Sequence, residues 1–243
     1  MTTATATFAN ATCRSCGQVF TYEPILVGHV DLAKSIHKTC HGCTTKAAIY
    51  EKLRRDQARA DKIEAEIQAS IPPDLFATDI RHPGFNSALW EAVSLWSPTP
   101  SEFWLGIVGA ADKSKTRCMA MLAMRSMRDG IRSTWTTANR LKDASDDRKS
   151  RERGLAANAR EHIQECLTSP WLFIDDLGKN EWSPAFEALF FQILDHRKNH
   201  RLPIVYSSNA HPDEFSQLIS GFNRWPIIGR LLDRTTLFDL RPQ

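Results

Sequence analysis

Short apolar runs alternate with longer segments of helical character over residues 73–243. The apolar runs predict strands at 103–108, 131–136, 171–174, 203–207 and 235–240. Segments with apolar residues at helical spacing predict helices at 85–96, 116–129, 155–167, 184–199 and 212–220. Strands that alternate with helices favour a parallel sheet flanked by helices and joined by right-handed crossovers. The expected fold class is therefore α/β.

The part of the chain before residue 73 has a different pattern. Residues 47–70 carry spaced apolar side chains among many charges, as in an exposed helix, and Pro72 and Pro73 end it. Residues 1–46 contain paired cysteines and too few apolar residues to fold as an independent core. We therefore expect three parts: a small module at 1–46, a linker helix at 47–72 and an α/β domain at 73–243.

Two adjacent acids, Asp175 and Asp176, directly follow the apolar run 171–174. Such a run is typical of a buried parallel strand, and open α/β sheets bind ligands at the carboxyl ends of their strands. In phosphate-handling proteins the first acid holds Mg²⁺ and the second orients a water molecule. The alternative is a strand that ends in a solvated acidic turn.

A phosphate-binding loop is predicted at residues 109–116, between the strand at 103–108 and a helix-forming stretch rich in Met, Ala and Leu. The pattern for such a loop is G-x-x-x-x-G-K-[ST], and Gly109, Lys115 and Thr116 match it. Backbone N–H groups of the loop wrap phosphates, the lysine neutralises charge, and the hydroxyl reaches Mg²⁺. ATP and Mg²⁺ are the expected ligands.

The loop departs from this pattern at two positions. Ser114 stands where the pattern has its second glycine, and Asp112 places an anion inside the loop. Because glycine relieves backbone strain there, we expect weaker phosphate binding or slow turnover, offset in part by the charge of Lys113. A loop that has lost nucleotide is the alternative. Four residues that carry the chemistry are retained: Lys115, Thr116, Asp175 and Asp176.

Four cysteines near the N-terminus form two C-x-x-C pairs: Cys13, Cys16, Cys40 and Cys43. Paired C-x-x-C turns supply the four thiolates that a structural Zn²⁺ ion prefers. Unliganded thiols or disulfides are the alternative, and His37 and His41 are substitute ligands that four cysteines make unnecessary. Cys118 and Cys166 fall in helix-like stretches, where a cysteine is more often a small buried residue than a reactive one.

Composition is that of a soluble globular protein, with 42% hydrophobic and 24% charged residues. No apolar run approaches the ~18 residues that a membrane helix needs, so no membrane partner is expected. The N-terminus lacks the basic start and apolar core of a secretory signal, which favours a cytoplasmic location, where disulfides are rare. The net charge of +3 neither requires nor excludes nucleic acid.

Three segments carry a resemblance to DnaC/IstB-like AAA+ ATPases, specifically to phage or bacterial helicase loaders with an N-terminal zinc module. They are residues 174–179, residues 186–197 and residues 202–209, which end in Ser207, Ser208 and Asn209. The family order is a Walker B strand, a helix, and a strand ending in a polar triplet. The resemblance implies an AAA+ P-loop core and, for a phage-encoded member, the host cytoplasm.

The resemblance also implies catalytic roles for three residues. Asp176 orients the hydrolytic water, Asn209 resembles the residue called sensor 1, and Arg230 in the segment 229–232 resembles an arginine finger. An arginine finger acts on a neighbour's nucleotide, which implies self-association through the ATP site. Arg224 and Arg234 are competing candidates. The resembling family lacks the helical lid of full AAA+ modules, and with 13 residues after Arg230 we expect no such lid here.

Three functions remain open at this point. The first is an ATP-dependent loader that delivers a hexameric replicative DNA helicase onto single-stranded DNA. The second is a DNA-binding transposition-helper ATPase, against which the zinc module argues. The third is a non-hydrolysing zinc/AAA+ adaptor for helicase or DNA. It is favoured because helicase loaders usually have a loop of the form G-P-x-G-x-G-K-T, and this chain keeps one of the three glycines, with Asp112 and Ser114 at the other two positions. Residues 131–160, with eight Lys/Arg against four Asp/Glu, are a candidate contact for DNA phosphates or a solvated loop.

Overall fold

The computed structural model describes residues 8–24, 26–27, 30–31, 39–78, 80–179, 182–219 and 221–241. Contacts divide the chain into two compact units, 1–62 and 63–243, each of which is described by itself. The three-part division with boundaries at 46 and 72 remains a prediction. His37 lies outside the described residues.

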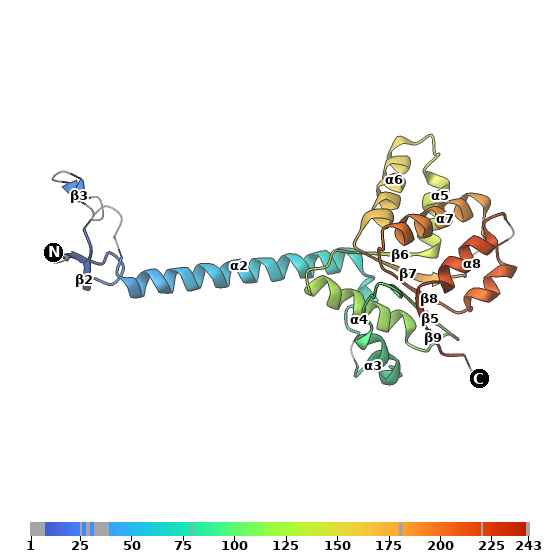
Figure 1. Ribbon diagram of the computed structural model, residues 1–243, viewed down its shortest axis with the longest axis horizontal. Helices are drawn as coiled ribbons and strands as arrows, with labels where there is room; N and C mark the ends of the chain where they lie inside the picture. The colour runs from blue at the N-terminus through green and yellow to red at the C-terminus, as the bar shows by residue number, and fades with distance from the viewer. Residues whose placement is uncertain are drawn as a thin grey trace, which may run out of the picture. The chain divides into compact units, whose positions relative to one another are not determined.

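A five-stranded parallel sheet forms the centre of the second unit, with the order β6-β7-β8-β5-β9 (Figure 1). Its strands are β5 (Trp104–Val108), β6 (Ser133–Thr137), β7 (Trp171–Leu177), β8 (Ile204–Ser208) and β9 (Thr235–Asp239). All five lie at or within a few residues of the predicted positions. The α/β class is confirmed, because each parallel connection crosses over through helical structure.

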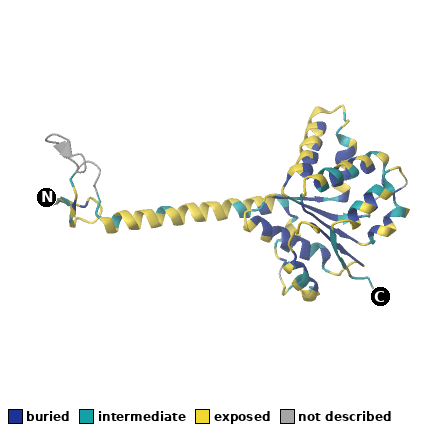
Figure 2. Cartoon of the chain, in the orientation of Figure 1, coloured by how far each residue is buried: buried dark blue, intermediate teal, exposed yellow. Residues whose placement is uncertain are grey.

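Helices cover both faces of this sheet. One face packs against α3 (Ser87–Leu95), α4 (Lys115–Arg128) and the end of α2 (His41–Ser70). The other packs against α5 (Ala138–Asp147), α6 (Arg153–Thr168), α7 (Pro184–Asn199) and α8 (Arg224–Leu232). Figure 2 shows the burial concentrated between the sheet and these helices. Two short 3₁₀ helices complete the unit: η1 (Pro73–Leu75) and η2 (Pro212–Gln217).

One helical prediction was wrong, and two helices were missed. Of the predicted helix 212–220, the described residues 212–219 form only the 3₁₀ helix η2, which begins with Pro212 at its first position. Helices α5 and α8 were not predicted at all. Polar and charged residues dominate α5, which has Leu141 as its one large apolar side chain, and α8 contains Pro226 inside its first turn. The helix predicted at 184–199 does form, as α7. Ser183 is its N-cap, and the Ser183 side chain accepts a hydrogen bond from the Phe186 N–H.

The first unit contains two antiparallel strand pairs and most of α2. The pairs are β1 (Ala9–Thr12) with β2 (Val19–Tyr22), and β3 (Leu26–Val27) with β4 (Val30–Asp31). Helix α2 begins at His41, earlier than the predicted start at residue 47, so that Cys43 lies in its first turn. Most of α2 is exposed, and Ile67 near its end is 2% exposed. In the described part of the chain, no helix is both long enough and apolar enough to span a membrane.

Candidate functional site: a phosphate-binding loop and a four-cysteine cluster

The loop between β5 and α4 begins at a position that only glycine tolerates. Gly109 has φ 141°, and a Cβ there would lie 2.7 Å from Cβ of Leu240. Its N–H donates to the carbonyl of Ser208 at 3.1 Å, which ties the start of the loop to the end of β8. Gly109 therefore shapes the loop through its backbone, as the sequence pattern requires.

Ser114 and Asp112 both adopt the left-handed backbone conformation for which glycine is the usual residue, with φ of 62° and 59°. The Ser114 hydroxyl accepts a hydrogen bond from the Asn86 N–H at 3.0 Å and donates to the Gly84 carbonyl at 3.3 Å. These bonds offset part of the cost of the left-handed conformation. Ser114 therefore adopts, at the start of α4, a backbone conformation that glycine would adopt without strain.

The residues after this turn surround a cavity of about 310 Å³. Its lining consists of residues 111–117 together with Asp175, Asp176, Lys179 and Asn209. Lys115 is 7% exposed, and its Nζ donates to the Ala110 carbonyl at 2.6 Å. Burial lowers the pKa of its ammonium group, although Asp176 opposes this effect. The loop thus holds one buried cation at the cavity.

Asp175 lies opposite the loop at the carboxyl end of β7. Its Oδ1 accepts hydrogen bonds from the Thr116 hydroxyl at 2.9 Å and from the Ser207 hydroxyl. Burial raises the pKa of this carboxyl group, and the bonds from Ser207 and Thr116 work against the rise. A carboxylate beside a threonine hydroxyl is an oxygen ligand set that suits Mg²⁺, so Asp175 and Thr116 can hold that ion.

A bulge in β7 contains both acids. The pairing of β7 with β8 is regular as far as Ile174 and resumes at Leu177, and between them Asp176 has φ 59°. The predicted strand ended at residue 174, whereas β7 continues to Leu177, which is fully buried. The Asp176 N–H donates to Ser207 Oγ at 3.1 Å. A bulge of this kind redirects a side chain at a site, and here it turns Asp176 into the cavity.

Three further residues at this site were assigned no role from the sequence, although Ser207 was named as part of the polar triplet. Ser207 contacts both acids, Arg117 lines the cavity and donates to the Thr78 hydroxyl at 3.1 Å, and Lys179 forms an ion pair of 2.7 Å with Asp176. Of the three, only Lys179 could have been placed at the site from the sequence, because it follows Asp176 by three residues across the turn at Gly178. The roles of Ser207 and Arg117 depend on contacts between distant segments.

The remaining predicted residues divide into two groups. Asn209 lies at the cavity, one residue past β8. Arg230 does not: one of its Nη atoms is 2.5 Å from Oδ1 of Asp195, and its guanidinium carbon is 4.4 Å from the ring centre of Phe191. Arg234 has a more exposed side chain (46%) and a longer contact of 3.4 Å to Asp233. Placement away from the cavity of its own chain is required of an arginine that acts on a neighbour.

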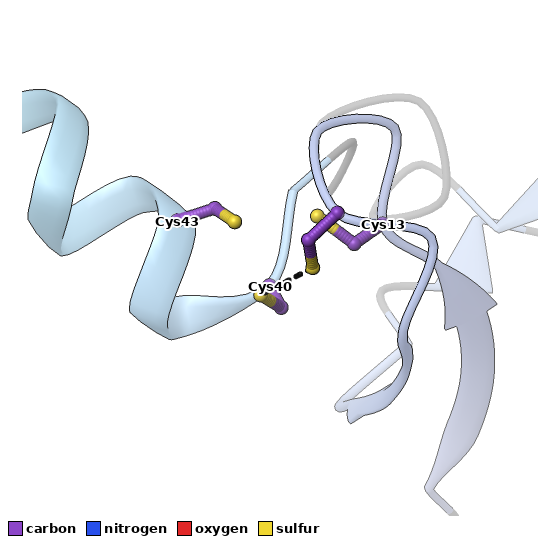
Figure 3. A group of neighbouring side chains, drawn as sticks. Cys13, Cys40 and Cys43 are labelled. Atoms are coloured by element: carbon purple, nitrogen blue, oxygen red, sulfur yellow. Dashed lines mark hydrogen bonds between the residues drawn. The ribbon is translucent and has the colours of Figure 1, made fainter.

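The four predicted zinc ligands lie together in the first unit. The sulfurs of Cys13, Cys16, Cys40 and Cys43 all lie within 4.8 Å of one another, and those of Cys16 and Cys40 are 3.7 Å apart. Tetrahedral Zn²⁺ with bonds of about 2.3 Å places sulfurs ~3.8 Å apart, so the cluster fits this ion. Figure 3 shows Cys13 on the turn after β1, Cys40 just before α2 and Cys43 in the first turn of that helix. Backbone N–H groups, chiefly that of Cys40, lower the pKa of Cys13 to about 6.

Comparison with known proteins agrees with this geometry. Residues 102–237, more than half of the chain, match the model of the family described as IstB-like ATP binding protein. The chain belongs to this family. No curated protein matches the IstB-like chain significantly. The family match contains the loop, both acids and Asn209, and it does not extend to the four cysteines.

Solved structures show that the fold of this IstB-like protein is shared. DnaI is 19% identical with a TM-score of 0.51, covering 73% of this chain and 91% of DnaI. Domain III of the Thermotoga maritima replication initiation protein DnaA is 18% identical with a TM-score of 0.54, and the match covers 71% of this chain and 69% of that domain. A Streptococcus pyogenes protein described as a primosome component is 18% identical with a TM-score of 0.51, and the match covers 72% of this chain and 87% of that protein. The expected AAA+ type of P-loop fold is thereby confirmed.

Proposed function

We propose that this IstB-like protein is an ATPase that loads a replicative DNA helicase onto single-stranded DNA. The observation that carries the ATPase part is the cavity at which buried Lys115, the Thr116 hydroxyl and the paired acids Asp175 and Asp176 converge. Phosphoryl transfer needs positioning and charge neutralisation more than covalent chemistry, and these residue types provide both.

The residues at the cavity that carry the proposed chemistry have separate roles. Lys115 and the N–H groups of residues 112–116 bind the phosphates, with Lys113 adding charge at the rim. Thr116 and Asp175 hold Mg²⁺, which when bound neutralises charge on the phosphate oxygens. Asp176 orients the attacking water, and Asn209 assists it. Ser207 positions both acids, because its hydroxyl contacts the Asp175 carboxylate and the Asp176 N–H.

The active site is completed by a second copy of the chain in this proposal. Arg230 must exchange its contact with Asp195 for a neighbour's phosphate, whereas Arg234 is less engaged and stays the alternative finger. Self-association is supported by two aromatic side chains beside Arg224 at the start of α8: Phe222 is fully exposed and Trp225 is 69% exposed. Exposed aromatic residues in such proximity are typical of protein contact surfaces.

The loader function rests on the resemblance of residues 174–209 and on the primosome description of one structural neighbour. We propose that the zinc-bearing first unit contacts the helicase and that basic residues at the turn from α5 to α6 contact DNA phosphates. Arg148, Lys149, Arg151 and Arg153 gather there. Such contacts read no base sequence and weaken with salt. A cytoplasmic location is part of the same proposal.

A non-hydrolysing adaptor is the second candidate. Asp112 favours it, because this carboxylate lines the cavity that the phosphates would occupy. In that case the AAA+ domain would bind helicase or DNA without turnover.

Pull-down against the replicative helicase hexamer of the source cell tests the loader function. We expect the full chain to retain the helicase, and ATP to promote its transfer to single-stranded DNA. The Lys115→Ala variant should retain helicase but not transfer it. Retention with ATP-independent transfer would favour the adaptor, and retention of a transposase in place of the helicase would favour the transposition helper.

A further inference from the structure

Lys179 lines the phosphate cavity although it lies outside the phosphate-binding loop. Its Nζ is 2.7 Å from Oδ1 of Asp176, and both side chains are partly exposed, at 48% and 40%. The cavity holds four cationic side chains and three acidic ones. The cations are Lys113, Lys115, Arg117 and Lys179, and the acids are Asp112, Asp175 and Asp176.

The turn that carries Lys179 is fixed by the fold. Asp176 and Gly178 have φ of 59° and 87°, and the Lys179 N–H donates to the Asp176 carbonyl at 3.3 Å. A Cβ on Gly178 would lie 2.7 Å from the ring of Phe215, a fully buried residue of η2. The turn is therefore packed against the core, and it presents the Lys179 side chain at a defined position beside the second acid.

The pair of Asp176 and Lys179 is the contact at this cavity that a nucleotide can most readily replace. Lys115 is buried and bound to its own loop, and Asp175 accepts bonds from two hydroxyls. A partly exposed ion pair contributes little to stability. An arriving triphosphate attracts the ammonium group of Lys179 and repels the carboxylate of Asp176.

We propose that Lys179 is a γ-phosphate-binding residue whose ammonium group leaves Asp176 for the γ-phosphate when a nucleoside triphosphate binds. The proposal rests on the proposed function, in which Asp176 orients the water that attacks the γ-phosphate. The acid must then lie beside that phosphate, and so must a cation 2.7 Å from it. Lys179 thereby distinguishes ATP from ADP and releases the catalytic acid only in the triphosphate complex.

Binding of two nucleotides to the full-length protein tests this role. Dissociation constants for AMPPNP and ADP, both with Mg²⁺, are compared for wild type, Lys179→Ala, Lys179→Arg and the exposed control Lys52→Ala in α2. Losing a charge-assisted contact should weaken AMPPNP binding by Lys179→Ala about ten- to a hundredfold and ADP binding by less than about twofold. Lys179→Arg should recover most of the affinity for AMPPNP, and Lys52→Ala should match the wild type.

A double-mutant cycle separates direct contact from an effect through Asp176. If Lys179 binds phosphate, Lys179→Ala weakens AMPPNP binding in the Asp176→Asn background as well. If Lys179 only positions Asp176, the loss disappears in that background and the proposal is wrong. Equal losses for AMPPNP and ADP, or none, would also overturn it. A folded wild type that binds neither nucleotide would instead refute the ATPase function itself, and this proposal with it.

Discussion

The hydroxyl of Thr116, in the first turn of α4, donates a 2.9 Å hydrogen bond to Oδ1 of Asp175 at the end of β7. These residues are 59 positions apart in the chain, and this bond joins the phosphate-binding loop to the strand that carries both acids. The Ser207 hydroxyl, on β8, donates a second hydrogen bond to the same oxygen of Asp175. The ends of β5, β7 and β8 thus define one site, and its residues can be tested separately.

Replacing Asp175 with Asn should stabilise the protein without ligand. Burial raises the pKa of this carboxyl group, so ionising it costs more in the folded than in the unfolded chain. The wild type therefore loses free energy of unfolding as the pH rises through the raised pKa, and Asp175→Asn does not. We expect a Tm a few degrees higher for the variant near neutral pH, with the difference shrinking as the pH falls.

Thermal unfolding in EDTA over a pH series measures this difference. Asp176→Asn is the matched control, since that side chain is 40% exposed and its replacement should change Tm less. A Tm for Asp175→Asn below that of the wild type throughout the series would show that the carboxylate is required for folding and not only for binding.

Ser114 allows the cost of its backbone conformation to be separated from the value of its hydroxyl. A left-handed residue other than glycine costs roughly 1–2 kcal/mol, and two partly exposed hydrogen bonds return a similar amount. Ser114→Gly should therefore be within about 1 kcal/mol of the wild type in urea unfolding, because both effects are lost together. Ser114→Ala keeps the cost and loses the bonds, so it should be destabilised by about 1–2 kcal/mol. Equal stability of Ser114→Ala and wild type would contradict the role assigned to the bonds to Asn86 and Gly84.

The sequence alone was sufficient to identify the candidate residues that belong to short motifs. The loop lysine and threonine, the paired acids and the cysteine pairs could be recognised because their spacing is local. Asn209 required the family resemblance. The bulge that turns Asp176 into the cavity could not be predicted, because the apolar run 171–174 ends before it and only pairing with β8 reveals it. The stabilising contact of Ser114 was hidden for the same reason, since Asn86 lies 28 residues away.

Arg197 on α7 should contribute more to stability than any surface charge of this unit. It is fully buried, and it donates to five backbone carbonyls, those of Cys166, Leu167, Ser169, Pro170 and Pro203. Burial lowers its pKa to about 9, so the guanidinium stays charged at neutral pH. Arg197→Leu leaves these carbonyls without the donor and should cost about 3–5 kcal/mol.

Urea unfolding of Arg197→Leu should be compared with that of Lys198→Met on the same helix. Lys198 forms a surface ion pair of 2.6 Å with Asp233, and its loss should cost no more than about 1 kcal/mol. Similar costs for the two variants would mean that the buried guanidinium does not stabilise the junction of α6, α7 and β8.

The cysteine cluster predicts that the first unit needs metal to fold. The wild type should hold about one Zn²⁺ per chain, and Cys40→Ser should lose it, because structural zinc sites require all four ligands. Native mass spectrometry measures the metal, and limited proteolysis measures folding of residues 1–62. Ser15→Ala, in the turn between Cys13 and Cys16, is the control and should keep the zinc. Protease resistance of residues 1–62 in Cys40→Ser without metal would contradict the prediction.

Mg²⁺-dependent binding and hydrolysis of ATP tests the central claim most directly, measured with and without single-stranded DNA for wild type and Lys115→Ala. Lys115 supplies the one buried cation of the loop, so the variant should lose binding and turnover together while it remains folded and zinc-loaded. Saturable binding and turnover in the wild type, absent from Lys115→Ala, is the result that the account predicts. A folded, zinc-loaded wild type that binds no ATP at millimolar concentration would contradict it and leave the adaptor as the function.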